Sequence, residues 1–219
     1  ISQFAVAGIS LANAYLALHP EAASTEAPHL LIDLGLESST VAIVAAGQLV
    51  YASSLLFGCQ RYTQELARDT GLAEEAAEER KRVISLDDEP EDGPLHRVTR
   101  QLEAELRETL DHWREQNAGD LAGRAFGRMA VCGGGARLGG LVEQLGRNHD
   151  CEAMVFGVPA GGTGAGKTSE ADSTNLENVI AYGSALQGGG VARFPVSLTP
   201  PPVLARACRR RNFPALVFG

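Results

Sequence analysis

Residues 160–170, AGGTGAGKTSE, contain the residue types of a phosphate-binding loop. Gly161 is followed, after four residues, by Gly166, Lys167 and Thr168, which satisfies every position of the P-loop motif. In a P-loop, backbone amides at the start of a helix bind the nucleotide phosphates, and the lysine and threonine contact the terminal phosphate and magnesium. The match to this motif therefore raises the question of whether a nucleotide binds here.

The residues around this motif favour a connecting loop instead. A strand predicted over 152–158 precedes it, but a P-loop helix must begin at the Gly-Lys-Thr itself. Residues 169–173 contain two carboxylates and nothing apolar larger than alanine. Thr174 and Glu177 have capping-box spacing, which predicts a helix only over 176–186. The phosphates would therefore have no helix N-terminus to bind.

A second candidate for phosphate chemistry is the stretch LLIDLGLESSTVAIV, residues 30–44. A predicted buried strand brings Asp33 to a tight turn at Gly35. The next strand begins with three hydroxyl side chains, those of Ser38, Ser39 and Thr40. Hydroxyls and backbone amides in such a hairpin can bind phosphates, and an aspartate can bind magnesium through water. The alternative is a plain β-turn that serves only the fold.

A third glycine-rich stretch, MAVCGGGARLGGL, runs from a predicted strand into a turn. The turn consists of Gly133, Gly134, Gly135 and Ala136. Glycines have no Cβ, so the backbone here can approach a flat ring closely. A helix is predicted from about Gly140, and the alternative is a tight strand-to-helix turn without a ligand.

The elements that must position these candidates follow from the hydrophobic pattern. Strands are predicted over 29–35, 40–47 and 48–58, with Gly47 at the tip between the last two. Two helices, 60–69 and 72–84, are separated at Gly71. A long amphipathic helix is predicted to pack on the sheet through Leu95, Val98, Leu102, Leu106, Leu110 and Trp113.

The remaining elements complete a mixed α/β sheet domain. Residues 1–18 are apolar and uncharged but carry scattered polar side chains, which favours a buried helix over a membrane span. A strand and a helix are predicted within 128–146. The net charge of −8 disfavours nucleic acid as a partner. The four cysteines are far apart and show no metal-ligand spacing with histidine, which favours a reducing compartment.

In their order, the hairpin and the glycine turn resemble the second phosphate motif and the adenosine motif of the actin-like ATPase superfamily. The stretch between them resembles the PilM family of type IV pilus assembly proteins. Gly58 and Thr63 match a glycine–threonine turn of that family, and the run 72–81 matches its acidic helix. CGGGARLGGL is similar to the family's GGGArLpGL, with Gly139 in place of proline, and residues 178–189 resemble its final helix. FtsA and GspL are more distant relatives.

This resemblance covers about residues 29–190 and implies an actin-like ATPase (RNase H-like) lobe, a mixed β-sheet with flanking helices. It implies ATP with magnesium as the ligand, with Asp33 holding the magnesium through water. No first phosphate motif or catalytic residue is visible, so the first lobe is expected to be largely missing from this fragment. Leu36 and Glu37 stand where active relatives prefer small residues, and a carboxylate there repels phosphate unless it turns outward. We therefore expect at most a weak ATPase.

The last residues, 191–219, differ in character from the rest. Four arginines (206, 209, 210 and 211) precede the apolar FPALVFG, which is typical of the cytoplasmic flank of a transmembrane helix, although an ordinary basic tail is the alternative. The segment also resembles the start of PilN, the membrane partner of PilM. Val196 and Leu198 are predicted to anchor this partner peptide, which is expected to be either disordered or docked on a neighbouring copy.

We therefore expect three segments: an N-terminal helix and linker (1–28), an actin-like domain (29–190), and a Pro/Arg-rich tail (191–219) leading to a membrane anchor. The expected function is that of a cytoplasmic scaffold in a type IV pilus or type II secretion-like platform, at the inner face of the inner membrane. Its expected partners are a PilN-like protein or fused segment and other platform proteins, with the membrane reached only through the C-terminal continuation. The alternative is an active actin-like ATPase or sugar-kinase-type enzyme whose first lobe is absent.

Overall fold

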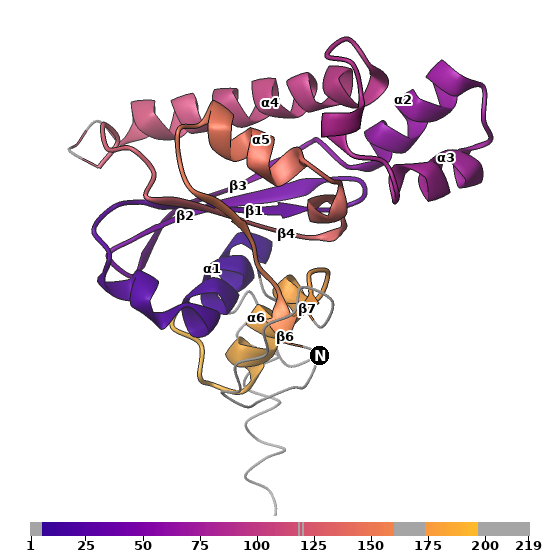
Figure 1. Cartoon of the computed structure of the whole chain (residues 1–219). Helices are drawn as coiled ribbons and strands as arrows, with labels where there is room; N and C mark the ends of the chain where they lie inside the picture. Colours follow the sequence, from indigo (N-terminus) through magenta and orange to yellow (C-terminus); the bar gives the residue numbers. More distant parts are fainter. Residues whose placement is uncertain (1–5, 118, 120, 160–173, 197–219) are drawn as a thin grey trace, which may run out of the picture.

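A five-stranded mixed sheet with helices on both faces forms the centre of the computed structural model (Figure 1), which describes residues 6–117, 119, 121–159 and 174–196. The strands of this sheet are β1 (His29–Leu34), β2 (Ser39–Ala45), β3 (Gln48–Leu55), β4 (Arg128–Cys132) and β5 (Ala153–Val155). Their order across the sheet is β3-β2-β1-β4-β5. The predicted mixed α/β architecture is therefore confirmed.

The first three strands form an antiparallel meander, and the last two are added parallel to β1. The tip of the second hairpin consists of Ala46 and Gly47, whose φ angles are +47° and +69°. Two positive φ angles are typical of the two-residue turns that match the twist of a hairpin. Gly47 thus lies where it was predicted. Because β1 and β4 run parallel, their carboxyl ends bring Asp33 and Cys132 side by side.

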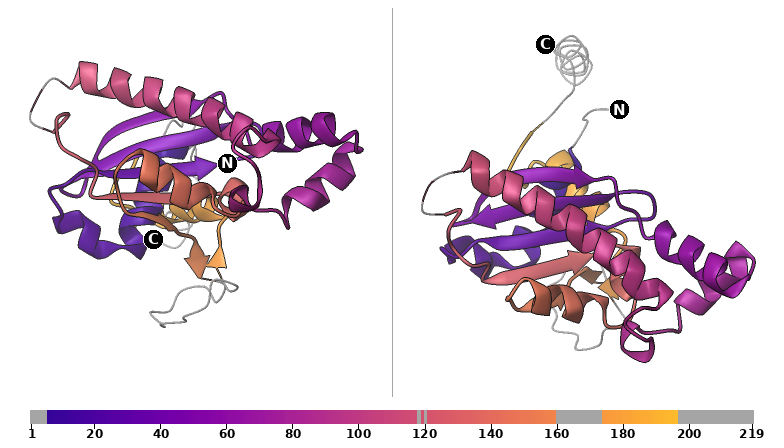
Figure 2. Two further views of the ribbon diagram at one scale, coloured as in Figure 1. Left: turned by 45° about the horizontal axis from the view of Figure 1, so that its top comes forward. Right: turned by 90° about the horizontal axis from the view of Figure 1, so that it is seen from above.

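One face of the sheet is covered by α4 (Pro94–Gln116) and α5 (Leu141–Asn148). All six apolar residues of the predicted α4 stripe are buried to 2% exposure or less, in one cluster with Leu30, Ile32 and Ile43 of the sheet. Figure 2 shows α4 running along this face, with α2 (Gln60–Thr70) and α3 (Glu74–Lys81) projecting beyond the sheet. Gly71 ends α2 in the left-handed conformation, as its position between the two predicted helices requires.

The opposite face is covered by α1 (Ala7–Leu18) and α6 (Val179–Gly188). Leu11 and Tyr15 of α1 are fully buried against this face, so the prediction of a buried N-terminal helix is confirmed. The two helices cross closely, because a Cβ on Gly183 would collide with the carbonyl oxygen of Ser10. Within the described residues, no helix combines the length and apolar character needed to cross a membrane.

Two predicted boundaries are wrong. The strand expected over 152–158 divides into β5 and β6 (Val158–Pro159), and β6 pairs with β7 (Thr174–Asn175). Thr174 belongs to β7, and α6 begins only after Asn178, later than the helix predicted from residue 176. The side chain of Asn175 instead accepts a hydrogen bond from the Glu177 amide. The P-loop-like residues lie outside the described part of the chain.

Candidate functional site

The glycine turn after β4 contains two closely packed glycines and one that faces open space. A Cβ on Gly133, whose φ is +84°, would lie 2.5 Å from an Asp33 carboxylate oxygen. A Cβ on Gly135 would collide with the Cys59 sulfur. A Cβ on Gly134, by contrast, would have only the Glu177 carboxylate within 4 Å, at 3.9 Å. Gly134 therefore presents its backbone to a space that a ligand can enter.

The β1–β2 hairpin is held against the start of α2. The amides of Cys59 and Gln60 donate to the carbonyl oxygens of Gly35 and Leu36, each at 2.9 Å. A Cβ on Gly58 would collide with the Leu36 carbonyl oxygen, so this close approach requires glycine. The hairpin and the helix therefore form one rigid wall beside the glycine turn.

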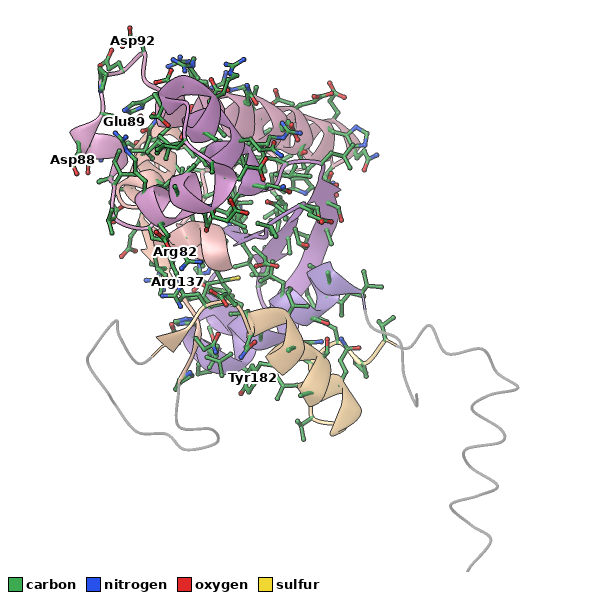
Figure 3. The ribbon with its side chains drawn as sticks, turned by 90° about the vertical axis from the view of Figure 1, so that its right-hand side faces the viewer. Arg82, Asp88, Glu89, Asp92, Arg137 and Tyr182 are labelled. Atoms are coloured by element: carbon green, nitrogen blue, oxygen red, sulfur yellow. The ribbon has the colours of Figure 1, made fainter. Side chains whose placement is uncertain are left out.

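A pocket of about 300 Å³ lies between this wall and the glycine turn. Its lining consists of Gly35, Leu36, Cys59, Tyr62, Glu78, Lys81, Arg82, Gly134, Gly135, Arg137, Leu138 and Glu177. Figure 3 shows Arg82 at the end of α3 close to Arg137 in the turn η3 (Gly134–Arg137). The acidic residues Asp88, Glu89 and Asp92 lie away from them in the same view.

Three cationic side chains line the pocket, against two carboxylates. Lys81 lies 2.6 Å from Glu78, and its ammonium group also donates to the Thr63 hydroxyl at 2.8 Å. Burial alone would raise the pKa of Glu78, but hydrogen bonds from Lys81 and Thr63, together with the positive charges of Lys81 and Arg82, outweigh burial and lower this pKa. Arg137 lies 3.4 Å from Glu177, and both of these side chains are more than half exposed. The exposed arginine can therefore reach an anionic ligand at little cost.

Apart from Asp33, the predicted nucleotide-binding residues divide into three groups. Gly35, Gly134 and Gly135 line the pocket. Gly133 instead packs against β1, and Ala136 is part of the apolar core. The hydroxyl residues of the hairpin do not line the pocket. Ser38 is exposed at the tip, Ser39 is buried and donates to the Phe57 carbonyl oxygen at 2.8 Å, and Thr40 lies near Gly8 on the α1 face.

Asp33 lies at the carboxyl end of β1, half-buried and outside the pocket lining. Burial raises the pKa of Asp33, and a hydrogen bond from the Cys132 thiol, at a sulfur–oxygen distance of 3.7 Å, offsets part of this increase. A carboxylate that is costly to keep ionised in the fold is common at functional sites. Asp33 remains a candidate for holding magnesium through water.

Replacing Asp33 with asparagine is expected to stabilise the fold at pH 7. The folded pKa lies above the ordinary value of 3.8, so ionised Asp33 costs folding free energy at any pH above the folded pKa. This cost disappears as the pH falls through the folded pKa towards 3.8. Thermal unfolding should show that Asp33→Asn is more stable than the wild type at pH 7, and that this difference in stability becomes smaller as the pH is lowered towards 3.8. A variant less stable than the wild type at pH 7 would contradict this interpretation.

The charged residues that line the pocket were not predicted from the sequence. Lys81 and Arg82 belong to the run EEAAEERKR, whose pattern indicates a solvated helix face. The available signal was Arg137, which directly follows the glycine turn. Cys59 also lines the pocket, but burial raises the pKa of its thiol to about 12, so it is not a reactive thiolate.

Comparisons with known proteins identify the family and the fold of the chain. The family model described as type IV pilus assembly protein PilM matches residues 1–188. No curated protein sequence matches significantly. Among solved structures, the PilM–PilN type IV pilus biogenesis complex is 20% identical with a TM-score of 0.52, over 81% of this chain and 51% of that one.

Two further structures are of MreB5 of Spiroplasma citri. The form bound to ADP is 15% identical with a TM-score of 0.58, over 84% of this chain and 59% of that one. The form bound to AMPPNP is 16% identical with a TM-score of 0.57, over 83% and 58%. This chain therefore spans between half and three fifths of the length of these relatives. The predicted actin-like ATPase fold is confirmed, as a partial domain.

Proposed function

The chain belongs to the PilM family of type IV pilus assembly proteins, and on this basis we propose that it is a scaffold component of a type IV pilus inner-membrane platform whose pocket binds ATP. The observation that carries the nucleotide part of the proposal is the pocket at Gly134. This pocket lies between the hairpin and the glycine turn, and a Cβ added at Gly134 would extend into it. Its three cationic side chains suit a ligand with phosphates.

The residues present fit such a ligand in different ways. Gly35, Gly134 and Gly135 would contact the ring and sugar, because these positions expose backbone rather than side chains. Lys81, Arg82 and Arg137 would supply positive charge to an anionic group. Asp33, at the neighbouring strand end, is the proposed residue for magnesium held through water.

Scaffolding is favoured over catalysis by the state of the carboxylates at the site. Hydrolysis requires a group that positions or deprotonates water. Glu78, the less exposed of the two carboxylates in the pocket, is engaged by Lys81 and Thr63. Leu36, 62% exposed at the hairpin tip, places an apolar side chain where a phosphate-binding turn needs polar groups. The alternative function is that of an active actin-like ATPase or sugar-kinase-type enzyme that uses residues of a first lobe.

The proposed partners follow from the family. We propose a PilN-like inner-membrane protein, or a fused segment of that kind, together with other platform proteins, at the cytoplasmic face of the inner membrane. The domain division at residues 29–190 and the tail 191–219 belong to the same proposal. Residues 193 and 194 are hydrogen-bonded to Gly47 and Asn13 of the same chain, so the expectation that the tail is disordered or docked on a neighbouring copy is wrong for its first, described residues. Val196, 38% exposed, remains a proposed anchor of the partner peptide, whereas Leu198 lies outside the described residues.

Titration calorimetry with ATP and ADP, with magnesium and with a chelator, tests the proposal, and a phosphate-release assay run in parallel separates the two function classes. Binding of nucleotide without turnover supports the scaffold. Steady phosphate release that requires magnesium would favour the enzyme. If neither nucleotide binds at millimolar concentration, the nucleotide part of the proposal is wrong.

A further inference from the structure

A buried threonine of α2, Thr63, joins two charged residues of α3 that line the pocket. Its hydroxyl accepts a hydrogen bond from the Lys81 ammonium at 2.8 Å and donates one to the Glu78 carboxylate at 2.5 Å. Lys81 and Glu78 are themselves 2.6 Å apart, so the three groups form a closed triangle. Thr63 is 5% exposed and does not line the pocket, whereas Lys81 and Glu78 do. Thr63 can therefore act on a ligand only through these two side chains.

The two helices that this triangle joins are anchored to the domain to different degrees. Tyr62 and Leu66 of α2 are buried to 1% exposure or less, and the Tyr62 hydroxyl is hydrogen-bonded to that of Thr99 in α4 at 3.0 Å. In α3, all of which the structure describes, Ala77 is the only buried residue. One alanine buries little apolar surface. The polar contacts of α3 with α2 therefore contribute more to its orientation than they would for a helix with a buried apolar face.

Glu78 alone cannot fix the position of the Lys81 ammonium in the pocket. The two residues are three positions apart on the same helix, so their ion pair moves together with α3. Thr63 is the one member of the triangle that belongs to another helix. Its hydroxyl therefore ties the ammonium to the wall formed by the β1–β2 hairpin and α2.

The ammonium still has a hydrogen to offer to a ligand. A lysine side chain carries three N–H donors, and among the described residues its hydrogen-bond partners here are Thr63 and Glu78. The side chain of Lys81 is only 13% exposed, so its long stem is already packed before a ligand binds. Ordering a free lysine side chain costs rotamer entropy, and a site that is ordered in advance avoids this cost on binding.

We propose that Thr63 is a positioning residue of the nucleotide pocket, which holds the Lys81 ammonium where it donates to an acceptor oxygen of the nucleotide. This inference rests on the proposed binding of nucleotide. It assigns to a residue outside the pocket lining a part in the affinity of the pocket.

The first test compares two replacements of Thr63 by titration calorimetry with ATP. Thr63→Val keeps the shape of the side chain and removes the hydroxyl, so it should bind ATP about tenfold more weakly, because the ligand must now order Lys81. Thr63→Ser restores the hydroxyl and should bind within about threefold of the wild type. Thr63→Ala lacks the same hydroxyl and should show the same loss if Thr63→Val does not fold. Wild-type affinity in the variants without a hydroxyl would overturn the proposal.

Two controls separate positioning from a general loss of structure. In a Lys81→Met background, Thr63→Val should weaken ATP binding no further, because the ammonium that Thr63 positions is gone. Thr99→Val removes another fully buried hydroxyl that is bonded to α2, so it should lower thermal stability and leave ATP affinity unchanged. A full further loss in the Lys81→Met background, or the same loss in Thr99→Val, would show that Thr63 does not act through Lys81.

A last measurement needs no ligand and so separates this inference from the proposed function. Burial raises the pKa of Glu78, but hydrogen bonds from Lys81 and Thr63, with the charges of Lys81 and Arg82, lower it overall. An NMR titration of the Glu78 carboxyl carbon should therefore show a higher pKa in Thr63→Val and the wild-type pKa in Thr63→Ser. If the wild type binds no nucleotide, the proposed function is wrong, whereas a raised pKa in Thr63→Val still supports the positioning of Lys81. An unchanged pKa of Glu78 in Thr63→Val would overturn that positioning.

Discussion

Replacing Leu106 with aspartate is expected to destabilise the domain by about 3–5 kcal/mol. Leu106 lies at the centre of α4 with no exposed surface, in the cluster that joins the helix to the sheet. The change removes a buried aliphatic side chain and places a carboxylate where no water can reach it. Because domains of this size are stable by only about 5–15 kcal/mol, chemical denaturation should show a clear shift of the midpoint.

Ala104→Asp is the matched control for this substitution. Ala104 is an exposed residue of the same helix, two positions away, so the same side chain there costs only helix propensity, roughly 0.7 kcal/mol. A Leu106→Asp variant as stable as Ala104→Asp would show that the α4 stripe does not contribute to the core.

The parts of the fold that the sequence predicts are those with a strong repeating pattern. In α4, six apolar residues at spacings of three or four can all be buried only on one helical face, and all six are. The start of α6 could not be predicted in this way. Thr174 has capping-box spacing, but it pairs with Pro159 in a small second sheet and α6 begins only after Asn178. This pairing leaves no local signal in the sequence.

The candidate site was likewise predicted only in part from the sequence. The glycines at 133–135 were predicted to permit a close approach, but their three roles depend on what lies opposite each Cβ. A Cβ on Gly133 would meet Asp33 and one on Gly135 would meet Cys59, whereas a Cβ on Gly134 would extend into the open space of the pocket, which Gly135 also lines. The packing of residues 191–196 on α1 was not predicted, because in the sequence Asn13 is a single polar residue in an apolar helix. Its hydrogen-bond partner, Phe194, lies 181 positions away in the sequence.

Gly134→Val is expected to abolish nucleotide binding while leaving the fold intact. No backbone or core atom lies within 4 Å of the Cβ position, and the φ angle of Gly134 is not in the left-handed region, so valine can be accommodated. Its two methyl groups would then occupy the space that the ring of a nucleotide needs. We expect affinity to fall at least about 100-fold, which corresponds to roughly 2.8 kcal/mol. Titration calorimetry at the same protein concentration for both forms measures this loss.

Two comparisons separate a blocked pocket from a damaged fold. Gly133→Ala places a Cβ against Asp33 at a φ of +84°, so it should lower thermal stability, whereas Gly134→Val should melt close to the wild type. Lys167→Ala, in the P-loop-like stretch, should leave nucleotide affinity unchanged, because the sequence of residues 169–173 lacks the apolar pattern of the helix that a P-loop requires. If Lys167→Ala abolishes binding and Gly134→Val does not, the nucleotide binds at the P-loop-like stretch, and the pocket between the hairpin and the glycine turn has another role.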